Sequence, residues 1–166
     1  MTGLEIALGV GIAALVAAAF GSGTRWSWPV RVRARITSKF GPRNLGDGHK
    51  HHAGVDIGVP LGTPVFPIGP GKVVVARMYS PEEVSQKSSG NYIAVDHEGG
   101  KRSLYMHLSE ISVRPGDVVS PQKPMALSGA SGRGIQMGPH LHLEIQVREL
   151  GGRFRNVDPL NYVLPI

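Results

Sequence analysis

Apolar and polar residues alternate in short runs along residues 37–166, and glycine or proline separates most of these runs. A period of two residues is typical of strands that bury one face. Turn-forming residues interrupt almost every window before a helix could nucleate. The pattern therefore predicts an all-β domain, an antiparallel sheet or a barrel-like arrangement, with few helices. The best strand candidates are rich in β-branched, aromatic or alternating apolar residues and cover residues 72–80, 91–97, 102–108 and 140–147. The polar residues 82–89 are expected to form an exposed loop.

The first 21 residues have a different pattern, because residues 3–20 are apolar except for Glu5. As a helix, such a segment is about 27 Å long at ~1.5 Å per residue, close to the thickness of a membrane core. It could be a membrane anchor, an export signal, or a helix packed in a protein assembly through its row of small residues. No Lys or Arg precedes the apolar run, which weakens the signal-peptide interpretation, although Ala17 to Ala19 resemble a cleavage site.

Residues 22–36 are expected to form a basic, Trp-containing linker that leads into a first strand. Val30, Val32, Ala34 and Ile36 alternate with three arginines, so residues 30–36 predict a half-buried strand. If the preceding apolar segment spans a membrane, these positive charges predict that the following domain, residues 37–166, stays on the cytoplasmic side.

Composition supports a folded domain and narrows its chemistry. The 166 residues are 41% hydrophobic and 18% charged, which is enough apolar material for a core. The sequence has no Cys, so histidines and carboxylates are the protein groups left to bind a catalytic metal. The net charge of +6 suits anionic wall polymers or phospholipid head groups, or serves ordinary solubility. No nucleic-acid-binding motif accompanies this charge, so nucleic acid is not an expected partner.

One strand candidate carries a histidine pair. Residues two apart share a face of a strand, so His140, His142 and Glu144 point to one side and the intervening leucines to the other. On a helix the two histidines would diverge by about 200°. The segment is either one wall of a polar site with a core behind it, or an exposed amphipathic strand with incidental histidines.

Two further segments carry histidines. His52 and Asp56 are four residues apart, which places both on the same side of an extended chain, and both residue types bind Zn²⁺. The neighbouring His49 and His51 leave a solvated loop as an alternative. His107 ends an apolar strand, where a lone histidine is more often a packing residue than a catalytic one.

Taken together and in order, these segments resemble the lysostaphin and LytM-type zinc metallopeptidases, which cut peptide bonds in bacterial peptidoglycan. The resemblance runs from about Phe40 to Pro159. It rests on these segments: Phe40-Gly41-Pro42-Arg43, His52 to Asp56, Gly62-Thr63-Pro64-Val65, Tyr105 to Leu108 and Gly138 to Glu144. It implies a β-sheet peptidase domain in which His52, Asp56 and His142 hold zinc, while His107 and His140 are unligated catalytic histidines.

This resemblance leads to an expected function, with alternatives. We expect a zinc-dependent endopeptidase in which His140 takes a proton from water and His107 serves the oxyanion or the leaving amine. Glu144 is expected behind the ligands or on the surface, and Arg43 is either a family motif residue or structural. The competing function is a non-catalytic, zinc-stabilised module that binds the wall or activates an amidase. The expected location is the cell envelope, membrane-associated or exported. The alternative is a virus particle, with residues 3–20 contacting membrane or virion subunits.

Overall fold

The computed structural model describes residues 26–43, 51–84, 88–132 and 137–166. The apolar helix expected over residues 1–21 lies outside these ranges, and the division of the chain at residues 21 and 36 stays a prediction. In the described part of the chain, no helix is both long and apolar enough to span a bilayer.

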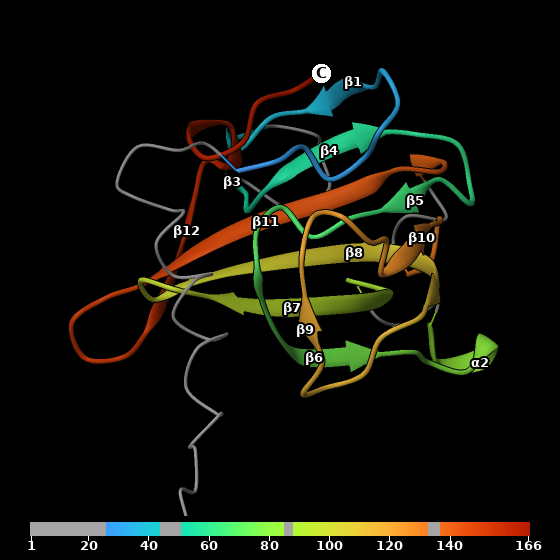
Figure 1. Cartoon of the computed structure of the whole chain (residues 1–166). Helices are drawn as coiled ribbons and strands as arrows, with labels where there is room; N and C mark the ends of the chain where they lie inside the picture. Colours follow the sequence, from blue (N-terminus) through green and yellow to red (C-terminus); the bar gives the residue numbers. More distant parts are fainter. Residues whose placement is uncertain (1–25, 44–50, 85–87, 133–136) are drawn as a thin grey trace, which may run out of the picture.

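A single antiparallel sheet of ten strands dominates the structure (Figure 1). The strand order along its main path is β1-β4-β11-β8-β7-β6-β9. In addition, β10 pairs with both β5 and β8, and β12 pairs with β11. The central strands are β11 (Leu141–Arg148), β8 (Lys101–Ile111), β7 (Asn91–His97) and β6 (Gly71–Arg77). The shorter strands of this sheet are β1 (Arg35–Ser38), β4 (Val55–Gly58), β5 (Pro64–Val65), β9 (Val118–Val119), β10 (Ala126–Ser128) and β12 (Phe154–Val157). A separate ribbon pairs β2 (Gly41–Pro42) with β3 (His51–His52).

The mostly β, antiparallel prediction is confirmed, and the four strand candidates coincide with β6, β7, β8 and β11. The described helical elements are α2 (Pro81–Val84) and the 3-10 turn η1 (Pro159–Asn161). The prediction of a loop over residues 82–89 is therefore wrong for its first residues, which are helical. Ser80 and Glu83 form a reciprocal capping box, in which each backbone N–H is 3.3 Å from the other's side-chain oxygen, and this stabilises one helical turn.

The strand predicted over residues 30–36 is wrong in its extent. Only residues from Arg35 onward are extended and paired, and Arg35 lies opposite Gly58, the last residue of β4. Residues 30–34 belong to no strand of the described structure, so the alternation does not hold there. Val30 is fully buried, whereas Val32 is 42% exposed.

One face of the sheet carries the hydrophobic core. Tyr105, Ile93, Leu141 and Leu143 are fully buried on the central strands and form one cluster with Trp28 from the N-terminal segment. The cluster also contains Val119 of β9 and Ala126 of β10, so these short strands belong to the same core. The alternate side chains of the same strands occupy the opposite face, and the chemistry lies there.

Candidate metal centre

Strand pairing brings three of the sequence-predicted residues to one point. Asp56 of β4 lies directly opposite His142 of β11, and His52 ends β3 just before β4 begins. Side chains of residues that lie opposite each other in an antiparallel pair share a face. His52, Asp56 and His142 are all buried, and their ligand atoms lie within 4.8 Å of one another.

The distances within this group suit a small cation. Asp56 Oδ1 is 2.7 Å from His142 Nδ1 and 3.2 Å from His52 Nε2, and these two nitrogens are 3.1 Å apart. Tetrahedral ligands at ~2.0–2.1 Å from zinc are about 3.3 Å from one another, close to these separations. A third nitrogen or sulfur ligand is not needed, because two histidines and a carboxylate already match a catalytic zinc site. The donor set therefore fits a zinc ion.

Backbone and side-chain acceptors orient the two ligand histidines. His52 Nδ1 is 2.8 Å from the Lys39 carbonyl, and Ser38 Oγ lies 3.1 Å from the same nitrogen. Because a carbonyl only accepts, Nδ1 carries a proton, so Nε2 is the nitrogen whose lone pair is available to a metal ion when the ring is neutral. The ring of His142 is turned the other way round. Its Nε2 is 3.2 Å from Glu144 Oε1, and its Nδ1 is the nitrogen that faces Asp56 and His52.

His140 and His107 border the group without belonging to it. His140 Nδ1 donates to the Gly138 carbonyl at 2.8 Å, and its Nε2 is buried without a partner 3.8 Å from Asp56 Oδ1. His107 Nδ1 donates to the Ser131 carbonyl, also at 2.8 Å. The two rings are 4.7 Å apart, centroid to centroid, and His107 is 6.0 Å from the ring of His142. Both histidines are thus anchored through Nδ1 and have Nε2 left for chemistry.

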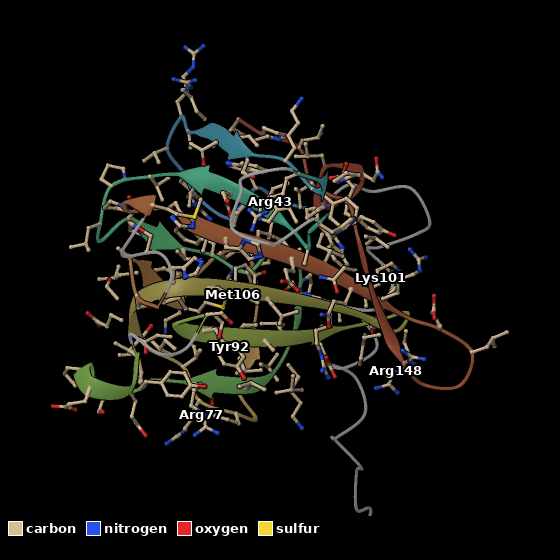
Figure 2. The ribbon with its side chains drawn as sticks, turned by 180° about the vertical axis from the view of Figure 1, so that it is seen from behind. Arg43, Arg77, Tyr92, Lys101, Met106 and Arg148 are labelled. Atoms are coloured by element: carbon tan, nitrogen blue, oxygen red, sulfur yellow. The ribbon has the colours of Figure 1, made fainter. Side chains whose placement is uncertain are left out.

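A β-bulge places His107 on this face. Tyr105 pairs with Ile93 and Leu108 pairs with Asn91, so Met106 and His107 together oppose the single residue Tyr92. Simple alternation would put His107 in the core beside Tyr105. Instead His107 has a left-handed backbone, φ 64°. The sequence interpretation of His107 as a lone residue at a strand end is wrong, since β8 continues to Ile111. In Figure 2, which views the molecule from the side opposite to Figure 1, Met106 and Tyr92 are labelled on these adjacent strands.

The prediction of one core face and one polar face on β11 is right in orientation, but the polar face is not open. His140, His142 and Glu144 are each at most 9% exposed, like the leucines between them. The β2–β3 ribbon, in which Gly41 pairs with His52, brings His52 against this face, with His52 Nε2 3.1 Å from His142 Nδ1. The alternative of an exposed strand with incidental histidines is therefore wrong.

Burial and charge shift the pKa values of the group. Burial opposes ionisation of Asp56, but hydrogen bonds from His142 and His52 outweigh it and hold the pKa of this carboxyl well below its ordinary value. Burial also disfavours the charged form of His142, yet the hydrogen bonds to Asp56 and Glu144 raise its pKa to about 9. Burial lowers the pKa of His107 to about 4, and the neighbouring His140 acts in the same direction. With these pKa values, Asp56 is an anion near neutral pH and His142 is protonated on both ring nitrogens. A metal ion that binds His142 must therefore displace a proton from it.

Sequence reasoning missed several partners of the group. The Lys39 carbonyl and Ser38, which orient His52, carry no motif signal. Asn156 on β12 donates to Glu144 and to the Ala53 carbonyl, and it lies outside every histidine segment. Arg43 follows β2, is labelled in Figure 2, and has a buried Nε without a hydrogen-bond partner.

Comparisons with known proteins agree with this geometry. The family model described as Peptidase family M23 matches residues 50–159. Among curated proteins, the chain is 36% identical over 148 residues to the peptidoglycan DD-endopeptidase ShyB of Vibrio cholerae, which covers 84% of this chain and 30% of that protein. The chain therefore spans less than a third of that relative's length.

Two solved structures are similar. One is a zinc containing peptidase from Vibrio cholerae, with a TM-score of 0.68 and 34% identity over 82% of this chain and 40% of that one. The other is the catalytic domain of lysostaphin from Staphylococcus simulans, with a TM-score of 0.65 and 32% identity over 78% of this chain and 91% of that one.

Proposed function

The chain belongs to peptidase family M23, and on that basis we propose that it is a zinc-dependent endopeptidase that hydrolyses peptide bonds in bacterial peptidoglycan. The resemblance to lysostaphin-type peptidases that its motifs indicated is confirmed. A relative that covers most of this chain is named a peptidoglycan DD-endopeptidase, which supports the wall as the substrate.

One observation carries the proposal. One oxygen of Asp56 and one ring nitrogen each of His52 and His142 converge within about 3 Å of one another, and the Nε2 atom of His140 lies unpaired beside them. The lone pairs of ligand atoms that converge in a buried site repel one another unless a proton or a cation lies between them. Three protein ligands with a neighbouring base are typical of a hydrolytic zinc site rather than a closed structural one.

We assign His52, Asp56 and His142 as the zinc ligands. A zinc ion held in this way supplies two things to hydrolysis: it makes a water molecule acidic near neutral pH, and it polarises the scissile carbonyl. Asp56 contributes the negative charge that such a cation needs in a buried site.

His140 and His107 are proposed to move protons. His140 accepts a proton from the attacking water at Nε2, because its Nδ1 is already committed to the Gly138 carbonyl. His107 has the same anchored arrangement and a low pKa, so it begins the reaction neutral. A proton released by the attacking water then protonates His107 at Nε2, and His107 donates it to the oxyanion or delivers it to the leaving amine.

The proposal is tested by release of new amino groups from purified peptidoglycan, with added zinc and with a chelator. We expect release that requires zinc and that is lost in Asp56→Ala, in which a ligand is missing. Absence of release from several wall types by zinc-loaded protein would contradict the proposal. That outcome would favour the alternative of a zinc-stabilised wall-binding or amidase-activating module.

The two histidine roles are tested separately. His140→Ala and His107→Ala should each lower kcat by about 10²–10⁴, the usual contribution of general acid-base catalysis, while zinc content stays at the wild-type level. Zinc content is measured by elemental analysis of the dialysed proteins. Unchanged turnover in either variant would remove that residue from the mechanism.

An envelope location, exported or membrane-associated, follows from the proposed substrate. Attachment to membrane or virion subunits through residues 3–20 rests on the sequence pattern alone. N-terminal sequencing of the native protein would distinguish a cleaved segment from a retained one.

A further inference from the structure

Four histidines border the site, and only one of them is oriented by a side-chain carboxylate. The Nδ1 atoms of His52, His107 and His140 each donate to a backbone carbonyl, at 2.8 Å in every case. Those three acceptors are backbone groups, of Lys39, Ser131 and Gly138. His142 instead has its Nε2 3.2 Å from Glu144 Oε1.

The Glu144 contact determines which nitrogen of His142 faces the ligand group. An ionised carboxylate only accepts hydrogen bonds, so the Nε2 of His142 must carry a proton. That leaves Nδ1, 2.7 Å from Asp56 Oδ1 and 3.1 Å from His52 Nε2, as the atom available to a metal. A ring turned over would aim an N–H at the cation and lose the ligand.

Glu144 is itself held in place. Its Oε2 accepts from Asn156 Nδ2 at 2.7 Å and has a long contact, 3.4 Å, with Gln146 Nε2. Asn156 uses the other hydrogen of the same amide to reach the Ala53 carbonyl at 2.9 Å. Ala53 lies in the turn between His52 and Asp56, so Asn156 connects Glu144 to the segment that carries the other two ligands.

The side chain of Glu144 is buried, and its hydrogen-bond partners are the His142 ring and the amides of Asn156 and Gln146. No Lys or Arg among the described residues pairs with it, so the carboxylate is directed at His142.

We propose that Glu144, held by Asn156, is a positioning residue that fixes the tautomer and ring orientation of His142, so that Nδ1 is the metal-binding atom. The inference rests on the proposed zinc site and adds a determinant of zinc affinity within it. Glu144 acts through His142 and does not touch the reacting atoms. Partners of this kind typically change metal affinity by about 10–100-fold when they are removed.

The test compares zinc affinity among full-length variants by competition with a chromophoric chelator. Glu144→Gln has nearly the same shape but loses the charge, and its amide can turn an N–H toward His142. Asn156→Ala leaves Glu144 in place without its short hydrogen bond. We expect zinc affinity to fall by about 10–100-fold in Glu144→Gln and by a smaller factor in Asn156→Ala. Gln146→Ala is the matched control, because it removes only two long contacts of 3.4 Å, to Glu144 Oε2 and to Asn156 Oδ1, and leaves the 2.7 Å hydrogen bond between those two residues; it should bind zinc like the wild type.

A spectroscopic readout separates positioning from general damage. In ¹⁵N-histidine-labelled, zinc-loaded wild type, the ¹⁵N shifts should identify His142 as metal-bound at Nδ1 and protonated at Nε2. Thermal unfolding of the metal-free variants shows whether they fold. If Glu144→Gln is unfolded, the zinc affinity and the ¹⁵N shifts of Asn156→Ala are compared with those of the wild type instead.

The outcomes discriminate between the two proposals. Wild-type zinc affinity in both folded variants, or coordination of His142 through Nε2, would overturn the role of Glu144 while leaving the zinc site intact. Failure of the wild-type protein to bind zinc at all would overturn the proposed zinc site itself.

Discussion

His107 departs from the strand pattern, and this departure places its side chain in the site. Its φ of 64° lies in the left-handed region, which side chains with a Cβ rarely adopt. Its side chain is nevertheless buried, and its Nδ1 is anchored on Ser131. Strain of this kind persists where the surroundings fix it, often at functional sites.

This strain predicts that His107→Gly is more stable than His107→Ala. A left-handed backbone costs a residue with a Cβ about 1–2 kcal/mol, and the greater freedom of glycine in the unfolded chain offsets about 0.4–1 kcal/mol of that. We expect His107→Gly to exceed His107→Ala by about 0.5–1 kcal/mol in free energy of unfolding, measured in urea on metal-free protein. Both variants lack the ring, so equal stability, or a more stable alanine variant, would argue against strain at this position.

Gly54 is a second residue that the site requires. A Cβ added there would lie 2.2 Å from the Leu143 carbonyl oxygen, because the turn between β3 and β4 packs directly against β11. We therefore expect Gly54→Ala to destabilise the protein by about 1–3 kcal/mol and to weaken zinc binding, since both ligand-bearing segments must move apart. The measurements are thermal unfolding and chelator competition.

Gly69→Ala serves as the control for Gly54→Ala. Its added Cβ would be 3.3 Å or more from the Trp26 ring, so the expected loss of stability is smaller and zinc binding is unaffected. Equal effects of the two substitutions would show that the close approach at Gly54 is not what holds the site together.

At the residue scale, the sequence predicts which residues meet better than how each is oriented. The spacings of His52 with Asp56 and of His140 with His142 place the side chains on common faces, as the structure has them. The orientation of His107 depends on a bulge in the pairing of β8 with β7, and no local pattern reveals it. The Lys39 carbonyl and Asn156 act through tertiary contacts, which local spacing does not encode.

Among the elements, β7 and β8 are joined on the core side by a buried chain of polar groups. The Ile68 N–H donates to Tyr105 Oη at 2.8 Å, Tyr105 Oη and Ser103 Oγ are 3.0 Å apart, and Ser103 Oγ lies 2.7 Å from His97 Nε2. His97 Nδ1 donates to the Pro70 carbonyl at 2.7 Å. Every polar atom of this chain is satisfied if His97 is neutral.

Tyr105→Phe should interrupt this chain without changing the shape of the core. The Ile68 N–H and the Ser103 hydroxyl would lose a partner in a site without access to water, at a cost of about 1–3 kcal/mol. Urea unfolding measures the loss. Tyr92→Phe, at a half-exposed ring on the opposite face, should change stability by less than about 0.5 kcal/mol. An equal effect of the two substitutions would contradict the structural role of the Tyr105 hydroxyl.

The same chain predicts how stability depends on pH. Burial lowers the pKa of His97 below its ordinary value of 6.5, and Lys101 adds to this effect, while the Pro70 carbonyl and Asp96 oppose it. The unfolded chain therefore binds a proton at His97 more readily than the folded one. Stability due to His97 should be complete above about pH 6.5 and should fall as the pH decreases below that value, by at most about 1.4 kcal/mol per pH unit.

The measurement is the urea midpoint at pH 7.5 and pH 5.0 for wild type and His97→Gln. The wild type should lose more stability than the variant between these two values, and the difference isolates His97 from the other histidines. A variant with the same pH dependence as the wild type would show that His97 is not protonated more readily on unfolding.

At the element scale, strand prediction succeeds where each strand has partners on both sides. β6, β7, β8 and β11 lie inside the sheet, so the alternation in their sequences separates a core face from the opposite face. Residues 30–34 alternate equally well but lack a partner, because β4 ends opposite Arg35. The turn of α2 was predictable in principle, since Ser80 and Glu83 have the spacing of a capping box.

In the molecule as a whole, the two faces of the sheet have different roles, one in stability and the other in the proposed chemistry. One face holds the core and the polar chain from His97 to Tyr105, and the opposite face holds the ligands and the two anchored histidines. β11 contributes to both faces, since Leu141 and Leu143 pack in the core while His142 and Glu144 serve the site. Stability and chemistry therefore depend on the same strand but on alternate residues of it.

The proposed reaction, hydrolysis of a peptide bond of the bacterial wall with a zinc ion held by His52, Asp56 and His142, adds one water molecule at each cut. Mass spectrometry of soluble fragments, released from purified peptidoglycan in H₂¹⁸O by the zinc-loaded chain, detects that water. We expect fragments with a new amino group and one ¹⁸O atom in a new carboxyl group, absent with chelator and with Asp56→Ala. Fragments without ¹⁸O, or no fragments from several wall types despite bound zinc, would contradict it.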